Sequence, residues 1–305
     1  MNTFDASNAQ FLSNLSLIQA RSDRAQQQIT STYRVSQVSD DPASVTDILS
    51  LTMEISRTSQ VKTNLSTVKA EVDTAETTVN QAVLLVQQAV SLAAQGASTG
   101  ASAATRTSLA QQVAGIFDQL VGLTSTQVQG RYIFSGDASK APTYQKNLAN
   151  PNGVDRLVQT TSTRLVEDAT GMTFGVGKTA QDIFDHRNAD DSLAPDNVFA
   201  ALNGLRTALA NNDSAGIDGA ITAVKTSADY LNVQQEFYGS VQTRIDGSMS
   251  TADQVSVRQQ AGLSDLRDAD VAAQALELTQ SKTALQAAMS AQSLRQRNSL
   301  FDYLK

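Results

Sequence analysis

Cysteine and tryptophan are absent from this chain of 305 residues, which has one histidine and four prolines. Without cysteine the chain can form no disulfide, thiolate nucleophile or zinc site of the Cys/His type. Only 5% of the residues are aromatic, whereas large side chains usually fill a globular core. The composition therefore favours long helices that bury narrow seams over one large core.

Further absences restrict the partners. No apolar run approaches the length of a membrane span. The net charge is −7 and the basic residues form no stripe, which argues against nucleic-acid binding. The N-terminal segment has no Lys or Arg before Arg21, unlike a cleavable secretory signal. We expect a protein that either stays inside the cell or leaves by a route that reads no such signal.

A heptad seam is the strongest pattern in the chain. Apolar residues recur at alternating steps of three and four at Leu65, Val68, Val72, Ala75, Val79, Ala82, Val86, Ala89 and Ala93. This spacing predicts a coiled-coil helix, and one helix alone could not hide such a stripe from water. Residues 109–123 and 217–245 repeat the pattern, so we predict a mainly α fold, a long antiparallel helical rod or bundle.

The middle of the chain has a different composition. Three of the four prolines lie within residues 142–195, and runs such as "RYIFSGD", "DRLVQTTSTRLVE" and "GMTFGVG" are bounded by turn residues. Such β-branched and aromatic runs are typical of strands. We predict a small β-rich outer domain at 132–194, inserted between two rod segments at 41–131 and 195–264.

The two ends, residues 1–40 and 265–305, are helical in pattern but carry few charges. We expect them to form paired terminal coiled-coil helices whose apolar faces are completed by other copies; a terminal hairpin that caps the same rod is the alternative. The expected packing residues are Phe4, Phe11, Leu15, Ile18, Leu278, Leu285, Met289, Leu294, Phe301 and Leu304.

Paired carboxylates precede a proline in "SDDP". Proline is favoured at the first helical position, so Asp41 suits the N-cap of a helix that begins at Pro42, with Asp40 beside it. Asp268 and Asp270 mark a second helix start near the other end. We expect the two starts to be spatial neighbours, with Arg267 in salt-bridge reach of Asp40 or Asp41.

Two further clusters were weighed for chemistry. His186 with Asp190 and Asp191 in "DIFDHRNADDSLAPD" could hold a divalent cation, but this run is polar and we interpret it as a solvated connector loop. "GMTFGVGKT" lacks the glycine spacing of a phosphate loop. We therefore expect no enzyme, no metal site and no cofactor.

Two motifs carry a family resemblance. "RVSQVSDDPASVTDI" resembles the N-terminal signature of flagellins and flagellar hook-associated proteins, and "GLSDLRDADVAAQALELTQSKTALQAAMSAQS" resembles their C-terminal signature. "GRYIFSGDASKAPTYQ", "ATGMTFGVGKTAQDIFD" and "NSLFDYLK" are more similar to the hook–filament junction members than to flagellin. The resemblance implies a terminal coiled-coil layer, a helical rod and an outer β domain.

The resemblance also implies a function. It implies a structural subunit of the bacterial flagellum, secreted through the flagellar type III export apparatus with the help of an export chaperone. Its partners would be hook-associated protein 1, flagellin and copies of itself, without membrane insertion. Flagellin, the filament subunit, and a coiled-coil adaptor or signalling rod stay open as alternatives.

Overall fold

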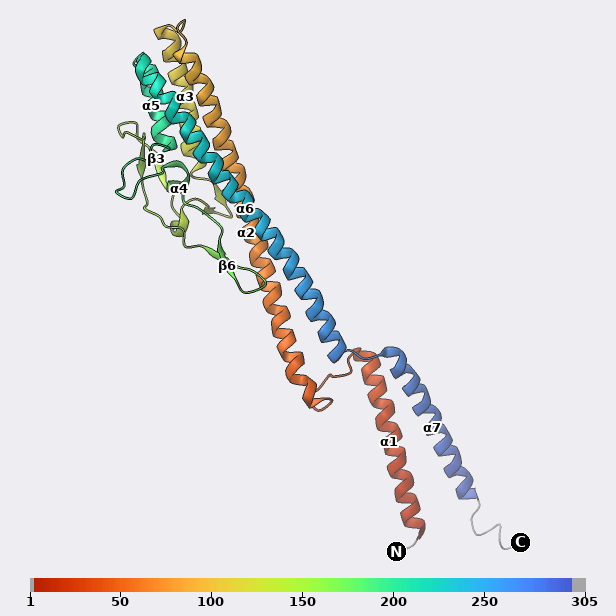
Figure 1. Ribbon diagram of the computed structural model, residues 1–305. Helices are drawn as coiled ribbons and strands as arrows, with labels where there is room; N and C mark the ends of the chain where they lie inside the picture. The colour runs from red at the N-terminus through yellow and green to blue at the C-terminus, as the bar shows by residue number, and fades with distance from the viewer. Residues whose placement is uncertain (1–2, 298–305) are drawn as a thin grey trace, which may run out of the picture. The chain divides into compact units, whose positions relative to one another are not determined.

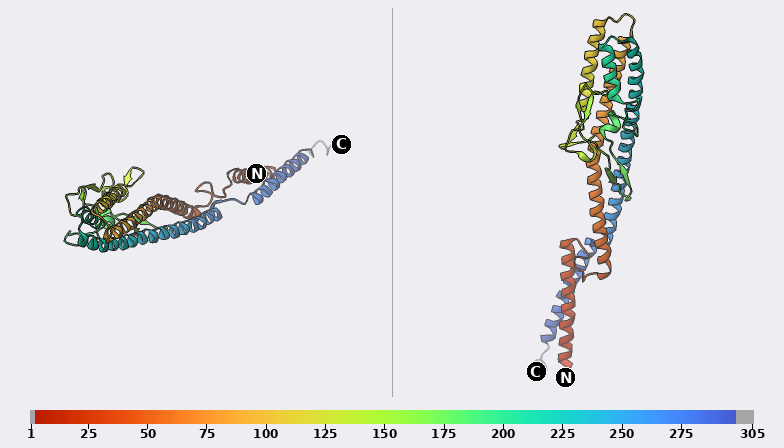
Figure 2. Two further views of the ribbon diagram at one scale, coloured as in Figure 1. Left: turned by 90° about the horizontal axis from the view of Figure 1, so that it is seen from above. Right: turned by 90° about the vertical axis from the view of Figure 1, so that its left-hand side faces the viewer.

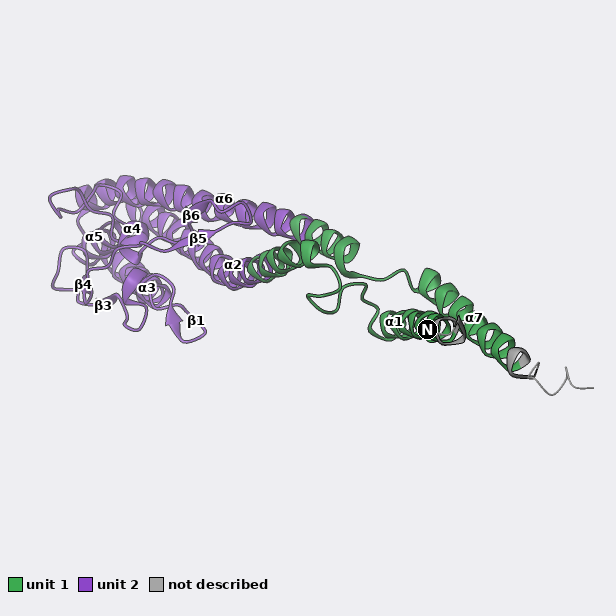
Figure 3. Ribbon diagram, turned by 90° about the horizontal axis from the view of Figure 1, so that it is seen from below, with its two compact units in different colours: residues 1–57, 255–305 green, residues 58–254 purple. Residues whose placement is uncertain are grey.

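The computed structural model describes residues 3–297, with the side chains of residues 8–293. It has two compact units (Figure 3): unit 1 comprises residues 1–57 and 255–305, and unit 2 comprises residues 58–254. Two long helices, α2 (Pro42–Ala97) and α6 (Ser214–Arg267), contribute to both units. This division differs from the expected one, because the start of α2 and the end of α6 group with the terminal helices.

In unit 2, α2 and α6 run beside α3 (Ala103–Leu123) and α5 (Val198–Ala210), as Figures 1 and 2 show. All nine predicted seam residues of α2 are buried, none more than 6% exposed. The second seam is buried as well, through Ile217, Val224, Leu231, Tyr238 and Ile245 of α6. The expected mainly α fold is therefore confirmed.

Polar residues begin the shorter helices of unit 2. Ser102 accepts a hydrogen bond from the Thr105 amide at the start of α3. Asn197 does the same for the Ala200 amide at the start of α5, at 2.9 Å. Each cap satisfies one amide that the helix itself leaves without a partner.

The insert contains a 3-10 turn (Gly136–Ala138) and three short antiparallel hairpins. Their strands are β1 (Gln127–Val128), β2 (Arg131–Tyr132), β3 (Tyr144–Lys146), β4 (Val154–Arg156), β5 (Leu165–Glu167) and β6 (Thr173–Gly175). Tyr144 lies opposite Arg156, and Val166 opposite Phe174. Strands this short make few ladder hydrogen bonds, so the insert depends on packing against the helices.

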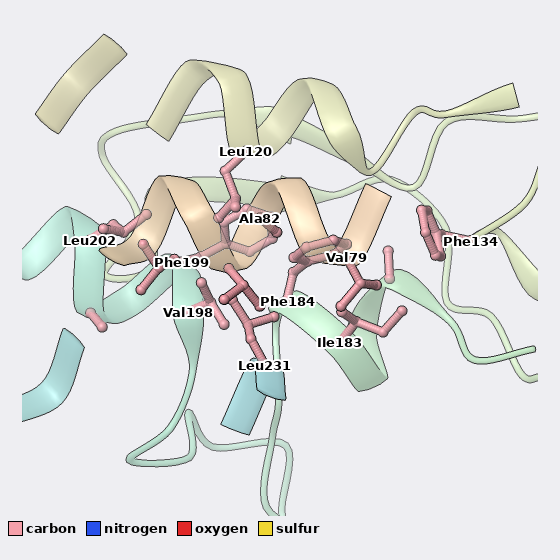
Figure 4. Packing of buried hydrophobic residues seen from close by; sticks show 14 of the residues in the cluster. Val79, Ala82, Leu120, Phe134, Ile183, Phe184, Val198, Phe199, Leu202 and Leu231 are labelled. Atoms are coloured by element: carbon pink, nitrogen blue, oxygen red, sulfur yellow. The ribbon is translucent and has the colours of Figure 1, made fainter. Parts of the chain in front are cut away.

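Aromatic side chains supply that packing, and Figure 4 labels three of them, Phe134, Phe184 and Phe199. The ring of Phe199 in α5 lies 5.4 Å from Tyr144, 5.8 Å from Phe117 and 6.1 Å from Phe184, measured between centroids. Phe134 meets Phe184 edge-on at 5.9 Å. Rings from the insert and from the bundle thus belong to one buried cluster.

One segment expected to be a polar connector is partly helical. Thr179 and Asp182 form a capping box that starts α4 (Ala180–Phe184), and Ile183 and Phe184 are fully buried. The acidic residues of this run suggest a polar loop, whereas its two apolar side chains indicate a packed helix. The expectation of a wholly solvated loop was therefore wrong.

A buried carboxylate follows α4. Asp185 is completely inaccessible and accepts four hydrogen bonds, from Tyr144 Oη (3.0 Å), Asn152 Nδ2 (2.9 Å), Asn197 Nδ2 (2.8 Å) and Arg187 Nε (2.9 Å). Burial raises the pKa of Tyr144, so this phenol remains a hydrogen-bond donor at neutral pH. The network ties β3 and the β3–β4 turn to the start of α5.

Candidate functional site: the terminal helix pair and its joint

Unit 1 is built around two helices from opposite ends of the chain. α1 (Thr3–Ser31) packs along α7 (Val271–Arg297), as Figure 1 shows. Ala25, Gln28 and Ser281 are buried. Small and polar residues at these positions leave the larger apolar side chains of both helices less fully covered.

The structure places the predicted packing residues unequally. Phe11, Leu15, Ile18, Leu278 and Leu285 are half-buried in the single chain, whereas Met289 is 54% exposed. The side chains of Phe4 and Leu294, and the whole of Phe301 and Leu304, lie outside the described residues. The heptad residues are therefore partly covered within the chain itself, and their role between subunits stays a prediction.

Three exposed leucines were not predicted as packing residues. Leu12, Leu17 and Leu276 are 62%, 59% and 60% exposed. They fall outside the heptad positions, but Leu12 follows Phe11 and Leu17 precedes Ile18 in the sequence. Apolar neighbours in direct sequence lie on different sides of a helix, which is the signal that could have identified a second apolar face.

A short antiparallel bridge connects the base of this helix pair. Tyr33 pairs with Asp268, and the Arg34 amide donates to the Arg267 carbonyl at 2.7 Å. The Ala269 amide donates to the Thr32 carbonyl at 2.9 Å. Residues 32–35 and 267–269 therefore form a joint that holds the end of α1 against the start of α7.

The paired carboxylates near this joint are structural hydrogen-bond acceptors. Asp40 Oδ2 accepts from the amides of Ser36 and Gln37, both at 2.9 Å, and from the Ser36 hydroxyl. These bonds, with the Ser36 amide first, hold the pKa of Asp40 below its ordinary value. The Ser44 hydroxyl and the Arg34 guanidinium likewise lower the pKa of Asp41.

Both helix starts carry an acidic cap. α2 begins at Pro42, and Asp41 Oδ1 accepts from the Ser44 amide at 3.3 Å. α7 begins at Val271, and Asp270 Oδ1 accepts from the amides of Ala272 and Ala273 at 3.0 Å. A carboxylate at this position also complements the positive end of the helix dipole.

The expected cation at the joint was wrong. Arg267 stacks over the Tyr33 ring at 4.1 Å and donates to Asp268 at 3.2 Å. Arg34 takes the predicted place instead: its Nη1 donates to Asp41 Oδ2 at 3.0 Å, and its Nη2 donates to the Leu266 carbonyl at 2.6 Å. A side chain from the first motif thus reaches the second, and brings the two helix starts together.

The other candidate clusters do not form sites. His186 pairs with Asp196 at 2.6 Å, Asp190 accepts from Ser192, and Asp191 pairs with Arg156. No group of three or more metal-ligating side chains occurs among the residues that the structure describes. In "GMTFGVGKT", Thr179 is a helix cap and Lys178 contacts Gln234 and the Phe237 ring, so neither faces a phosphate-sized opening.

Comparisons with known proteins agree with the N-terminal part of the chain. The family model described as the bacterial flagellin N-terminal helical region matches residues 2–139. Flagellar hook-associated protein 3 of Escherichia coli (strain K12) is 27% identical over 215 residues, which are 65% of this chain and 66% of that protein. Over these residues the chain is similar to flagellins and to a flagellar hook-associated protein.

Solved structures of flagellar hook-associated proteins share the fold. A putative flagellar hook-associated protein from Vibrio parahaemolyticus matches with a TM-score of 0.65 at 18% identity, covering 75% of this chain and all of that one. Flagellar hook-associated protein 3 from Legionella pneumophila matches with a TM-score of 0.62 at 12% identity, over 72% of this chain and 98% of that one. The expected resemblance to flagellins and flagellar hook-associated proteins is confirmed, and the choice between the two types stays a prediction.

The matched region spans just under two thirds of the Escherichia coli relative. The names of these relatives assign them to the flagellum. None of the described helices combines the length and the apolar character needed to cross a membrane.

Proposed function

We propose that this chain is a structural subunit of the bacterial flagellum that joins hook-associated protein 1 to the flagellin filament. The observation that carries the proposal is the helix pair α1–α7, which presents Leu12, Leu17, Leu276 and Met289 to solvent. Four large apolar side chains exposed on one pair of helices are typical of a surface that another protein covers.

Assembly would proceed by covering these side chains. Burying an exposed leucine contributes about 1.5–3 kcal/mol, so several such residues offset the entropy lost when a subunit docks. Copies of the chain and the adjoining flagellar proteins would supply the complementary helices. In this proposal the terminal segments, 1–40 and 265–305, perform assembly, and 132–194 faces outward from the helical part, 41–131 and 195–264.

Export completes the proposal. The chain would leave the cell through the flagellar type III apparatus, with an export chaperone holding its C-terminal segment, and would function outside the cell. Its partners would be hook-associated protein 1, flagellin and itself. The role is assembly rather than catalysis, which the mutually satisfied side chains around His186 and Asp185 support.

A deletion strain tests the proposal. Removal of the gene should leave hooks intact while flagellin is shed into the medium, and the wild-type gene should restore filaments. Loss of the flagellin pool itself would instead assign the chain as flagellin. A purified full-length chain that forms a stable coiled-coil dimer, with protease-resistant ends, would favour the adaptor class.

A further inference from the structure

A basic groove lies in unit 1 between α1 and α7. It measures about 300 Å3, and its lining includes Arg21, Arg24, Arg34 and Glu277, with Ala25 and Gln28 among the buried residues at its floor. Arg21 and Arg24 are exposed and form no hydrogen bond or ion pair within the described residues, and Arg24 acts on Asp40 only through space. Arg34 is already paired with Asp41, so Arg21 and Arg24 are the two guanidinium groups of the groove without an ion pair, against the single carboxylate of Glu277.

Two unpaired carboxylates lie elsewhere in the same unit. Asp47 of α2 and Asp265 of α6 are exposed, and neither has an ion pair or a side-chain hydrogen bond among the described residues. Gln259 contacts Glu54 at 3.4 Å, and Gly262 lies beside Leu51, which fixes the antiparallel register of the two helices. About one helical turn beyond Leu51 and Gly262, this register places Asp47 of α2 and Asp265 of α6 at the same height along the helix pair.

This level of the helix pair differs from those in unit 2. There two of the acidic residues that face the neighbouring helix have lysine partners, Asp253 with Lys62 and Asp246 with Lys69, and Glu76 accepts from Gln235. At Asp47 and Asp265 two carboxylates share a level without a cation. A cation brought by another molecule would therefore reduce their mutual repulsion.

We infer that the arginine groove of one copy receives Asp47 and Asp265 of a second copy. A contact between two different patches of identical subunits is heterologous, and repetition of such a contact generates rings or helical assemblies. Guanidinium groups suit carboxylates because their planar fork donates two parallel hydrogen bonds. The inference rests on the proposed function, because it names the electrostatic contact that sets the register of neighbouring subunits.

Charge exchange tests the contact in a strain that lacks its own gene. The variant R21E/R24E and the variant D47K/D265K should each reduce filaments per cell about tenfold or more. The combined fourfold variant should restore them, because the charges are exchanged and the pairing is kept. K282E is the matched control, since Lys282 is an exposed cation of α7 outside the groove, and it should behave like the wild type.

Each variant is also followed by its helical melting curve and by its amount in the exported fraction, and R21Q/R24Q replaces R21E/R24E if the latter unfolds. The inference is overturned if the groove variant supports filaments as well as K282E does. It is equally overturned if the fourfold variant is folded and exported but restores nothing. In that case the groove would bind another partner or no partner at all.

A second readout needs no flagellum. Because the chain has no cysteine, R24C and D47C chains can be mixed and joined by a short bismaleimide. We expect a cross-linked dimer at low ionic strength that disappears at high salt, and none for K282C with D47C. If wild-type complementation fails, the proposed function fails, and equal cross-linking of the two pairs would reject the groove contact separately.

Discussion

Arg34 donates one hydrogen bond to Asp41 Oδ2 at 3.0 Å and a second to the Leu266 carbonyl at 2.6 Å. One guanidinium group thus connects the cap of α2 to the last turn of α6. The geometry requires the planar fork of arginine, because an ammonium group on a shorter reach cannot serve two acceptors in the same way. The joint between the terminal helices and the longer helices depends on this residue.

Arg34→Lys should loosen the joint. The side chain is 43% exposed, so solvent screening limits the expected loss to about 1 kcal/mol. Native-state hydrogen exchange should show faster opening at the Arg34 and Ala269 amides, with the core amides of unit 2 unchanged. Arg258→Lys, at an exposed position of α6, is the control. Equal exchange in both variants would contradict a role for the fork.

Acid should release the turn at Asp40. The folded-state pKa of Asp40 is lowered by its hydrogen bonds from Ser36 and Gln37, whereas the unfolded value is about 3.9. The stabilisation is therefore fully present above the unfolded pKa and is lost as the pH falls through the folded pKa. NMR shifts of the Ser36 and Gln37 amides, followed from about pH 6 to pH 2, should report this transition. Asp40→Asn should remove it.

Asp185→Ala should destabilise unit 2. It leaves four buried donors without their acceptor, which costs about 3–5 kcal/mol and lowers Tm by roughly 10 °C. Asp185→Asn keeps the shape and one acceptor, so its effect should be smaller. Asp190→Ala, which removes only the exposed bonds to Ser192, is the control and should melt like the wild type. A D185A variant with an unchanged Tm would refute the network's contribution.

Alanine substitutions at two glycines should distinguish the cost of backbone strain from the cost of side-chain crowding. Gly153 and Gly130 have nearly the same φ, +75° and +76°, but a Cβ on Gly153 would lie 2.7 Å from Phe117 Cζ, whereas a Cβ on Gly130 would meet nothing within 4 Å. Gly130→Ala should cost about 1–2 kcal/mol from the left-handed backbone alone. Gly153→Ala should cost about 1–3 kcal/mol more because it overpacks the core. Equal costs in urea denaturation would show that Phe117 yields freely.

Leu17→Asp should block assembly without unfolding the chain. Leu17 is 59% exposed, so the change in stability should stay within about 0.5 kcal/mol, while incorporation into filaments is lost. Phe11→Asp should also weaken the α1–α7 pair, because Phe11 is half-buried. Circular dichroism melts and filament counts separate the two effects. Gln19→Asp, at an exposed polar position of the same helix, should retain both stability and filaments.

The heptad seams could be predicted because helical periodicity is local. Residues from Leu65 to Ala93 had to share one face whatever lay opposite them, and they are buried. The cation of the joint could not be predicted in the same way. Because Tyr33 pairs with Asp268 in the bridge, Arg267 lies over the Tyr33 ring and Arg34 is the arginine that binds Asp41. The register of the bridge decides which of the two arginines binds Asp41, and this register cannot be read from the sequence.

The burial of Asp185 could not be predicted from the sequence either. Asp185 stands in a run with other aspartates, and nothing local distinguishes it from the exposed Asp190 or Asp191. Its four partners come from three separate stretches of the chain, so its environment exists only after folding. The exposed leucines of the terminal pair were missed for a different reason, because a search for one stripe does not test for a second.

Phe199 touches rings from three other parts of the chain, Phe117, Tyr144 and Phe184. A change of side chain in either the insert or the helices would therefore alter the fit of this ring. Exchange of residues 132–194 with the corresponding piece of a relative would bring in foreign partners for Phe199 and leave a cavity or a clash. Substitutions intended to vary residues 132–194 should therefore be made in the exposed loops, and the aromatic residues around Phe199 should be kept.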